Sequence, residues 1–136
     1  MKKDWDILYE TALKQLHNAE IPPFIKIGQN ACCILAQSNN AYAGVNVLSN
    51  TSLNSCAEKN AMIAMLNHGE HRIKKIVILN ELEELITPCE KCVENLLELC
   101  EDSDSIEILT DLKNYKTIKL TDIAPAWWGT YKQKKK

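Results

Sequence analysis

The sequence contains no long hydrophobic run and only one phenylalanine. Its longest uninterrupted apolar stretch covers residues 31–36, far fewer than the roughly 18 residues that a membrane-spanning helix needs. Residues 1–6 include acidic and aromatic side chains where a secretory signal would need an apolar segment. These absences predict a protein that does not cross a membrane and works in the cytoplasm.

A strong charge of either sign is also missing. The formal net charge is −2, and Arg72 is the only arginine, so the protein lacks the positive field that collects a nucleic-acid polymer. Four lysines give residues 129–136 the character of a basic, solubilising tail, namely Lys132, Lys134, Lys135 and Lys136. Hydrophobic residues make up 46% of the chain and charged residues 25%, which excludes a disordered protein. Its length of 136 residues predicts a single domain spanning residues 1–136.

Hydrophobic periodicity divides the chain into helices and strands. Apolar residues spaced three and four apart predict a helix over residues 4–18. Short apolar segments at 30–35 and 42–47 predict two strands joined by a turn. A helix should begin near Ser55 and end by Gly69, followed by a buried strand at 76–79 and a helix that opens at Pro88. Two further strands are predicted at 106–109 and 115–120. This order favours an α/β fold with one mixed sheet and helices packed on its faces.

Cysteine is the informative residue type, with six in the chain. In a cytosolic protein of this size, cysteines are more often metal ligands or catalytic groups than disulfides. Cys56 opens one predicted helix, and Cys89 and Cys92 open the other. Helix N-termini that follow strands gather at one edge of a sheet, so these three sulfurs can meet. The other three cysteines are expected to be small buried hydrophobes: Cys32, Cys33 and Cys100.

The spacing of Cys89 and Cys92 is one that zinc sites use repeatedly. Positive helix N-termini are expected to lower the pKa values of these thiols. Three protein ligands on tetrahedral zinc leave a fourth position for water, whose pKa the metal lowers to about 7. Glu58 lies two residues after Cys56, where it can move protons without being a ligand.

Cys56-Ala57-Glu58, followed by Pro88-Cys89-x-x-Cys92, resembles the signature of the cytidine deaminase family of zinc-dependent hydrolytic deaminases. The resemblance runs from about residue 31 to residue 125. It implies a three-layer fold with a mixed five-stranded sheet flanked by helices. By this resemblance, Cys56, Cys89 and Cys92 bind Zn²⁺ and Glu58 shuttles protons as a cytidine-like nucleoside loses ammonia.

The resemblance also implies substrate contacts at Asn46, Ala57, Leu48 and Trp127, and a homotetramer or dimer. Asn46 corresponds to an asparagine that contacts the sugar hydroxyl. Trp127 and its neighbour Trp128 could instead pack in the core or at an interface.

Three features depart from the family pattern, the first being the first strand, where Asn30-Ala31-Cys32-Cys33 only loosely resembles the family's Phe and Gly-Ala-Ala run. Leu48 occupies the position of a ribose-binding glutamate, a feature shared with the blasticidin deaminase branch. It favours as an alternative substrate a modified nucleoside, a free base or a nucleoside antibiotic. Val93 replaces an arginine that offsets thiolate charge, and Lys59 or Lys91 could compensate.

Two alternative interpretations of the cysteines involve no catalysis. Val93 leaves open a non-catalytic, zinc-bearing binding protein. A closed structural zinc site would need His68 or His71 as fourth ligand, and both lie roughly 18 Å along the helix from Cys56. His17 is expected at the surface.

Overall fold

The structure is a computed structural model that describes residues 4–99 and 105–123. Its elements in the first half are α1 (Asp4–Gln15), β1 (Ala19–Ile21), β2 (Ile25–Ala36), β3 (Ala41–Leu48) and α2 (Ala57–Asn67). The second half contains β4 (Ile73–Leu79), α3 (Glu90–Glu98), β5 (Glu107–Asp111), β6 (Lys116–Lys119) and α4 (Leu120–Ile123). None of the described helices is long and apolar enough to span a membrane. Cys100, Trp127, Trp128 and the predicted tail at 129–136 lie outside the described residues.

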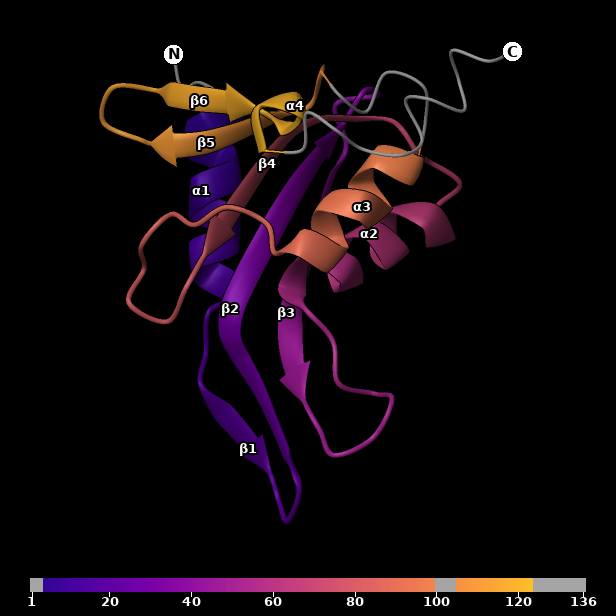
Figure 1. The fold of residues 1–136 in the computed structure, drawn as a ribbon. Coiled ribbons are helices and arrows are strands. Elements are labelled where there is room, and N and C mark those ends of the chain that lie inside the picture. Colours follow the sequence, from indigo (N-terminus) through magenta and orange to yellow (C-terminus); the bar gives the residue numbers. More distant parts are fainter. Residues whose placement is uncertain (1–3, 100–104, 124–136) are drawn as a thin grey trace.

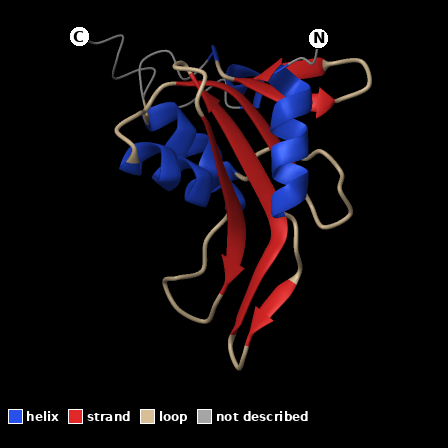
Figure 2. Cartoon of the chain, turned by 180° about the vertical axis from the view of Figure 1, so that it is seen from behind, coloured by secondary structure: helices blue, strands red, loops and turns tan. Residues whose placement is uncertain are grey.

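The strands form one mixed sheet between two helical layers. β2 pairs antiparallel with β1, β3 and β4, β4 runs parallel to β5, and β5 pairs antiparallel with β6. Helix α1 covers one face of the sheet, and α2 and α3 lie on the other (Figures 1 and 2). The predicted α/β architecture is therefore confirmed, and the described residues contain six strands in place of the five expected.

The long strand β2 separates the two halves of the core. Cys32 and Ile34 face the cluster formed with α2 and α3, whereas Cys33 and Leu35 face the cluster formed with α1. This alternation is the two-residue period of a strand that is buried on both faces. Cys32 and Cys33 have no exposed surface, which confirms the prediction that they are buried hydrophobes.

The first helix ends earlier than predicted because the chain goes on to form β1, a strand that was not predicted. The prediction extended this helix to residue 18, but α1 stops at Gln15. The backbone N–H of His17 donates to the carbonyl of Gly28, so the chain leaves the helix to lie beside β2. Gly28 has a φ of 80°, and a Cβ there would lie 1.8 Å from the His17 carbonyl oxygen, so only glycine fits this crossing.

Candidate metal centre

The first cysteine, Cys56, is the last residue of the loop that joins β3 to α2. Cys56 is the N-cap of α2 in an extended conformation, with φ −81° and ψ 155°, and its side chain makes no capping hydrogen bond. Helix α2 lies very close to β3 because Gly44 has no side chain: a Cβ there would lie 2.4 Å from the backbone nitrogen of Ala61. This close approach fixes the position of the N-terminus of α2, and with it Cys56.

The other two cysteines belong to the start of α3. Cys89 is the N-cap of α3, and Cys92 lies in its first turn with only 1% of its surface exposed. Cys89 is exposed. The predicted placement of all three cysteines at two helix starts is therefore found, with each helix beginning one residue after its N-cap cysteine.

The three sulfur atoms lie within 4.8 Å of one another, and those of Cys56 and Cys89 are 3.6 Å apart. Two sulfurs bound to one tetrahedral zinc at about 2.3 Å each would lie about 3.8 Å apart. The thiols are free and not joined in disulfides. The donor set and its spacing therefore fit zinc bound by Cys56, Cys89 and Cys92.

A carboxylate lies beside the sulfurs. Glu58 is only 5% exposed, and its Oε2 accepts a hydrogen bond of 3.3 Å from the backbone N–H of Cys89. A buried carboxylate costs free energy unless its oxygens are hydrogen-bonded or paired with a cation. Glu58 is thus held against the α3 N-terminus, which also carries Cys89 and Cys92.

The predicted lowering of the thiol pKa values is wrong for two of the three cysteines. Burial raises the pKa of Cys56, and contact with Cys89 raises it further. Burial also raises the pKa of Cys92 well above its usual range, with the negative charge of Glu58 as the second cause. The loss of hydration and the nearby negative groups raise these two pKa values by more than the positive helix N-termini lower them. A bound cation would reverse this balance, because metal binding displaces the thiol protons.

The predicted substrate residues lie on two neighbouring elements. Asn46 and Leu48 alternate with Gly44 along β3 and so share its α2-facing side. The Asn46 side chain is 7% exposed, and its Oδ1 accepts the backbone N–H groups of Gln29 and Asn30, at 2.8 and 2.9 Å. Leu48 is 41% exposed, whereas Ala57 is fully buried.

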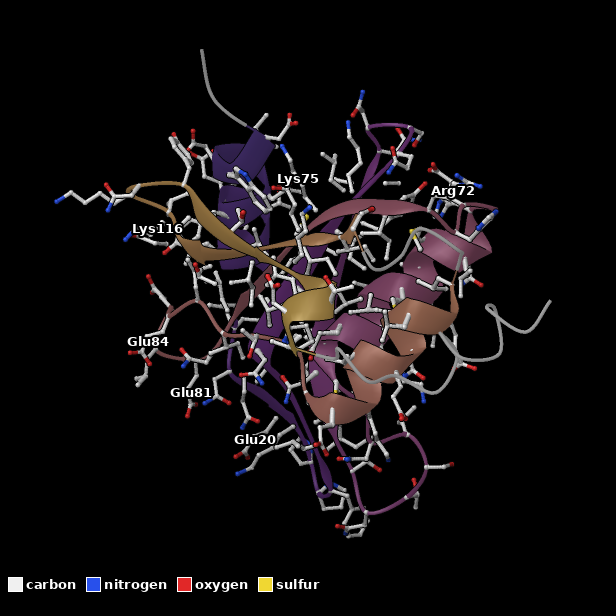
Figure 3. All side chains as sticks on the ribbon, turned by 45° about the horizontal axis from the view of Figure 1, so that its top comes forward. Glu20, Arg72, Lys75, Glu81, Glu84 and Lys116 are labelled. Atoms are coloured by element: carbon white, nitrogen blue, oxygen red, sulfur yellow. The ribbon has the colours of Figure 1, made fainter. Side chains whose placement is uncertain are left out.

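The two candidate cations, Lys59 and Lys91, lie on the helices that carry the cysteines at their N-termini. Lys59 lines a cleft of about 390 Å³ between α2 and α3, together with Asn95 and Glu98. Arg72 lies beyond the C-terminal end of α2, at the opposite end of the helix from Cys56 (Figure 3). Lys91 is exposed in the first turn of α3. Compensation of thiolate charge by Lys59 or Lys91 stays a prediction.

The histidine alternative does not fit this geometry. His68 follows the C-terminal end of α2, where its ring lies 5.3 Å from that of Tyr42 and its Nδ1 lies 2.8 Å from the Ala64 carbonyl oxygen. His71 lies farther along the chain, before β4. Neither belongs to the cysteine cluster, so the closed structural site is wrong for the described part of the chain.

One residue near the site was missed from the sequence. Asn60 contacts both Ser55 and β3 through its side chain. A signal did exist, because asparagine disfavours helix interiors and occurs there when its amide has a hydrogen-bonding task.

The three clustered thiols and the buried carboxylate lie at two helix N-termini of a three-layer α/β fold, an arrangement that can hold zinc beside a proton carrier. The sequence matches the family described as "Cytidine and deoxycytidylate deaminase zinc-binding region" over residues 5–104. The chain belongs to this family. The predicted family, enzyme class and zinc cofactor are thereby confirmed.

Individual relatives agree with this assignment. The cytidine deaminase of Mycoplasma genitalium is 27% identical over 95 residues, which cover 68% of this chain and 72% of the relative. The cytidine deaminase of Sporosarcina psychrophila is 27% identical over 110 residues, covering 80% and 78%. Among solved structures, the cytidine deaminase from Mycobacterium tuberculosis has a TM-score of 0.74 at 22% identity, covering 93% of this chain and 98% of its own. The enzyme from Burkholderia pseudomallei has a TM-score of 0.70 at 22% identity, covering 94% and 100%. These structural matches show the same fold.

Proposed function

We propose that this protein removes the amino group of cytidine, deoxycytidine or a closely related aminopyrimidine nucleoside by hydrolysis of the carbon–nitrogen bond. Water and the nucleoside are consumed, and the keto product and ammonia are released. The observation that carries the proposal is the buried Glu58 carboxylate beside three clustered sulfurs. A reaction of this kind would serve pyrimidine salvage in the cytoplasm, where free thiols persist.

In this proposal Cys56, Cys89 and Cys92 hold zinc. Bound zinc would supply a water molecule with a pKa near 7. Glu58 takes a proton from the attacking water and passes protons to the ring nitrogen and the departing amine. The Cys89 N–H keeps the Glu58 carboxylate aimed at the site through both transfers.

Measurement of ammonia release from cytidine, cytosine and blasticidin S tests the substrate. We expect cytidine to have the highest kcat/KM. If cytidine is inert and one of the other compounds turns over, the site is still a deaminase but its substrate class is different. The proposed substrate class is wrong if the zinc-loaded protein releases ammonia from none of these three compounds and does not release it from deoxycytidine either.

A second candidate, a modified nucleoside or free base, is favoured by Leu48. Its half-exposed apolar side chain lies on the same face of β3 as Asn46 and offers no hydrogen bond to a sugar hydroxyl. Under this candidate, Leu48→Glu raises activity on cytidine, whereas Leu82→Glu, a matched change at an exposed leucine of the loop after β4, does not. A loss of cytidine activity in Leu48→Glu would instead favour cytidine as the substrate of the parent.

We further propose that the protein is a homo-oligomer. The β1–β2 hairpin, the end of β3 and the loop after it project at one end of the fold (Figure 1), and four exposed large hydrophobic residues belong to these segments, namely Ile21, Phe24, Leu48 and Leu53. Exposed apolar patches mark interaction surfaces. Light scattering coupled to size-exclusion chromatography measures the mass of the protein directly, and a monomer at micromolar concentration would contradict the proposal.

A further inference from the structure

The side chain of Asn60 and a backbone bridge together occupy part of the free edge of β3 next to the cysteine cluster. Among the described strands, β3 pairs only with β2, so its other edge leaves backbone groups open. The Nδ2 of Asn60 donates to the carbonyl of Val45 on that edge, at 2.6 Å. Farther along, Val47 and Ser55 exchange two backbone hydrogen bonds of 2.9 Å each. The segment that leads into α2 is therefore fastened along this edge.

The same amide reaches the residue that precedes Cys56. The Ser55 hydroxyl lies 3.0 Å from Nδ2 of Asn60 and 3.3 Å from its Oδ1. The Val45 carbonyl can only accept, which fixes the orientation of the amide with its nitrogen toward β3. Asn60 is thus joined to a strand and to the loop at once, although it belongs to neither.

The backbone of Asn60 adds a contact on the other side of the cysteine. Its N–H donates to the carbonyl of Cys56 at 3.2 Å, as the first hydrogen bond of α2. Cys56 itself has an extended backbone, and its side chain makes no capping bond that would hold it in place. The position of its sulfur thus depends on how its backbone is held, and Asn60 contacts both the preceding residue, Ser55, and the carbonyl of Cys56 itself.

We propose that Asn60 is a positioning residue that holds Cys56 in register with Cys89 and Cys92 for metal binding. The proposal rests on the ligand assignment of the proposed function. Partners that orient a metal ligand typically contribute 10–100-fold to metal affinity. Asn60 acts through Ser55 and the Cys56 backbone and not through the sulfur, so we expect an effect near the lower end of that range.

The test compares zinc binding by the folded parent protein with that by Asn60→Ala, Ser55→Ala and the double variant. The matched control is Asn67→Ala, which makes the same change at the exposed last residue of α2. Zinc affinity is measured by competition with a chromophoric chelator, and the metal geometry by the absorption of the cobalt-loaded protein. The urea midpoint of each metal-free protein is recorded separately.

We expect Asn60→Ala and Ser55→Ala each to weaken zinc binding about tenfold and to alter the cobalt spectrum. The double variant should be little worse than the single ones, because both changes break one network. Asn67→Ala should bind zinc as the parent does. Should Asn60→Ala fail to fold, Ser55→Ala alone decides, since it keeps the bond between Asn60 and β3.

A purely structural role for Asn60 would lower the urea midpoint but leave the zinc affinity and cobalt spectrum of the folded protein unchanged, and that result would overturn the proposal. Absence of zinc binding in the parent is a different outcome, because it would remove the ligand assignment and the proposed function with it. Normal zinc binding by the parent and by Asn60→Ala refutes only the positioning role.

Discussion

The backbone N–H of Cys89 donates to Oε2 of Glu58 at 3.3 Å, so the first turn of α2 and the N-terminus of α3 meet through a proposed proton carrier and a proposed ligand. Two helices that are separated by a whole strand in the sequence thus share one hydrogen bond at the metal centre. The carboxylate gains a donor that compensates for part of its lost hydration.

Replacement of Glu58 should abolish catalysis and leave the metal centre intact. Glu58→Gln keeps the shape of the side chain and an oxygen for the Cys89 N–H, but it cannot carry protons. We expect kcat to fall by about 10²–10⁴-fold with an unchanged zinc content. The control, Glu90→Gln, changes an exposed carboxylate in the first turn of α3. Ammonia release and metal analysis check both variants, and near-parental turnover by Glu58→Gln would contradict its assigned role.

Loss of one sulfur should remove the metal. The parent is expected to contain one zinc per chain, Cys92→Ala to lose it, and Cys33→Ala to retain it, because Cys33 lies on the opposite face of the sheet. Zinc binds the folded state, so a chelator should lower the melting temperature of the parent and of Cys33→Ala but leave Cys92→Ala almost unaffected. Elemental analysis and thermal melts provide the readouts. Full zinc occupancy in Cys92→Ala would show that the ligand set is different.

A methyl group at Gly44 should push α2 away from β3. In Gly44→Ala the new Cβ would lie 2.4 Å from the Ala61 nitrogen and 2.8 Å from the Ala57 carbonyl oxygen, both of them backbone atoms. Overpacking of this kind lowers the free energy of unfolding by about 1–3 kcal/mol, and zinc affinity should fall because Cys56 moves with the helix.

Gly69→Ala is the matched control for that substitution. Gly69 has a φ of 80°, so alanine is strained there, but the space that the new methyl group would occupy is open. This variant should lose stability and keep its zinc affinity. Urea unfolding and chelator competition measure the two quantities, and equal zinc affinity in both variants would refute the link between Gly44 and the site.

The carboxylate of Glu70 should make stability depend on pH. The Ser38 hydroxyl, followed by the Tyr42 hydroxyl and the Asn40 amide, donates to it and lowers its pKa. A folded-state pKa below the unfolded value gives stability that is present at neutral pH and is lost as the pH falls through the folded value. The stability difference between the parent and Glu70→Gln should therefore be largest near pH 7 and should shrink below about pH 4.

Denaturant unfolding at several pH values tests this expectation. Glu81→Gln serves as the control, since Glu81 is an exposed carboxylate in the loop after β4 (Figure 3). A difference between the parent and Glu70→Gln that stays constant from pH 7 to pH 3 would show that the lowered pKa does not contribute to stability.

The hydrophobic periodicity and the residue types of short segments were sufficient to predict most helices and strands and to select the three candidate cysteines. The unbroken apolar segments of β2 and β4 follow from a strand buried on both faces, and Gly69 ends α2 because a left-handed residue suits a helix C-terminus. The short strand β1 was missed because it exists only by pairing with β2, and three residues carry too little periodicity to predict it.

The sequence by itself determined which residue types could form a metal site, since the spacing of Cys89 and Cys92 and the neighbouring Cys56-Ala57-Glu58 are properties of the chain. Only the tertiary structure decided the direction of the thiol pKa shifts, because burial depends on what packs around a group. It also decided that Asn60 reaches β3 and Ser55, a contact between distant segments that exists only once α2 lies against the sheet.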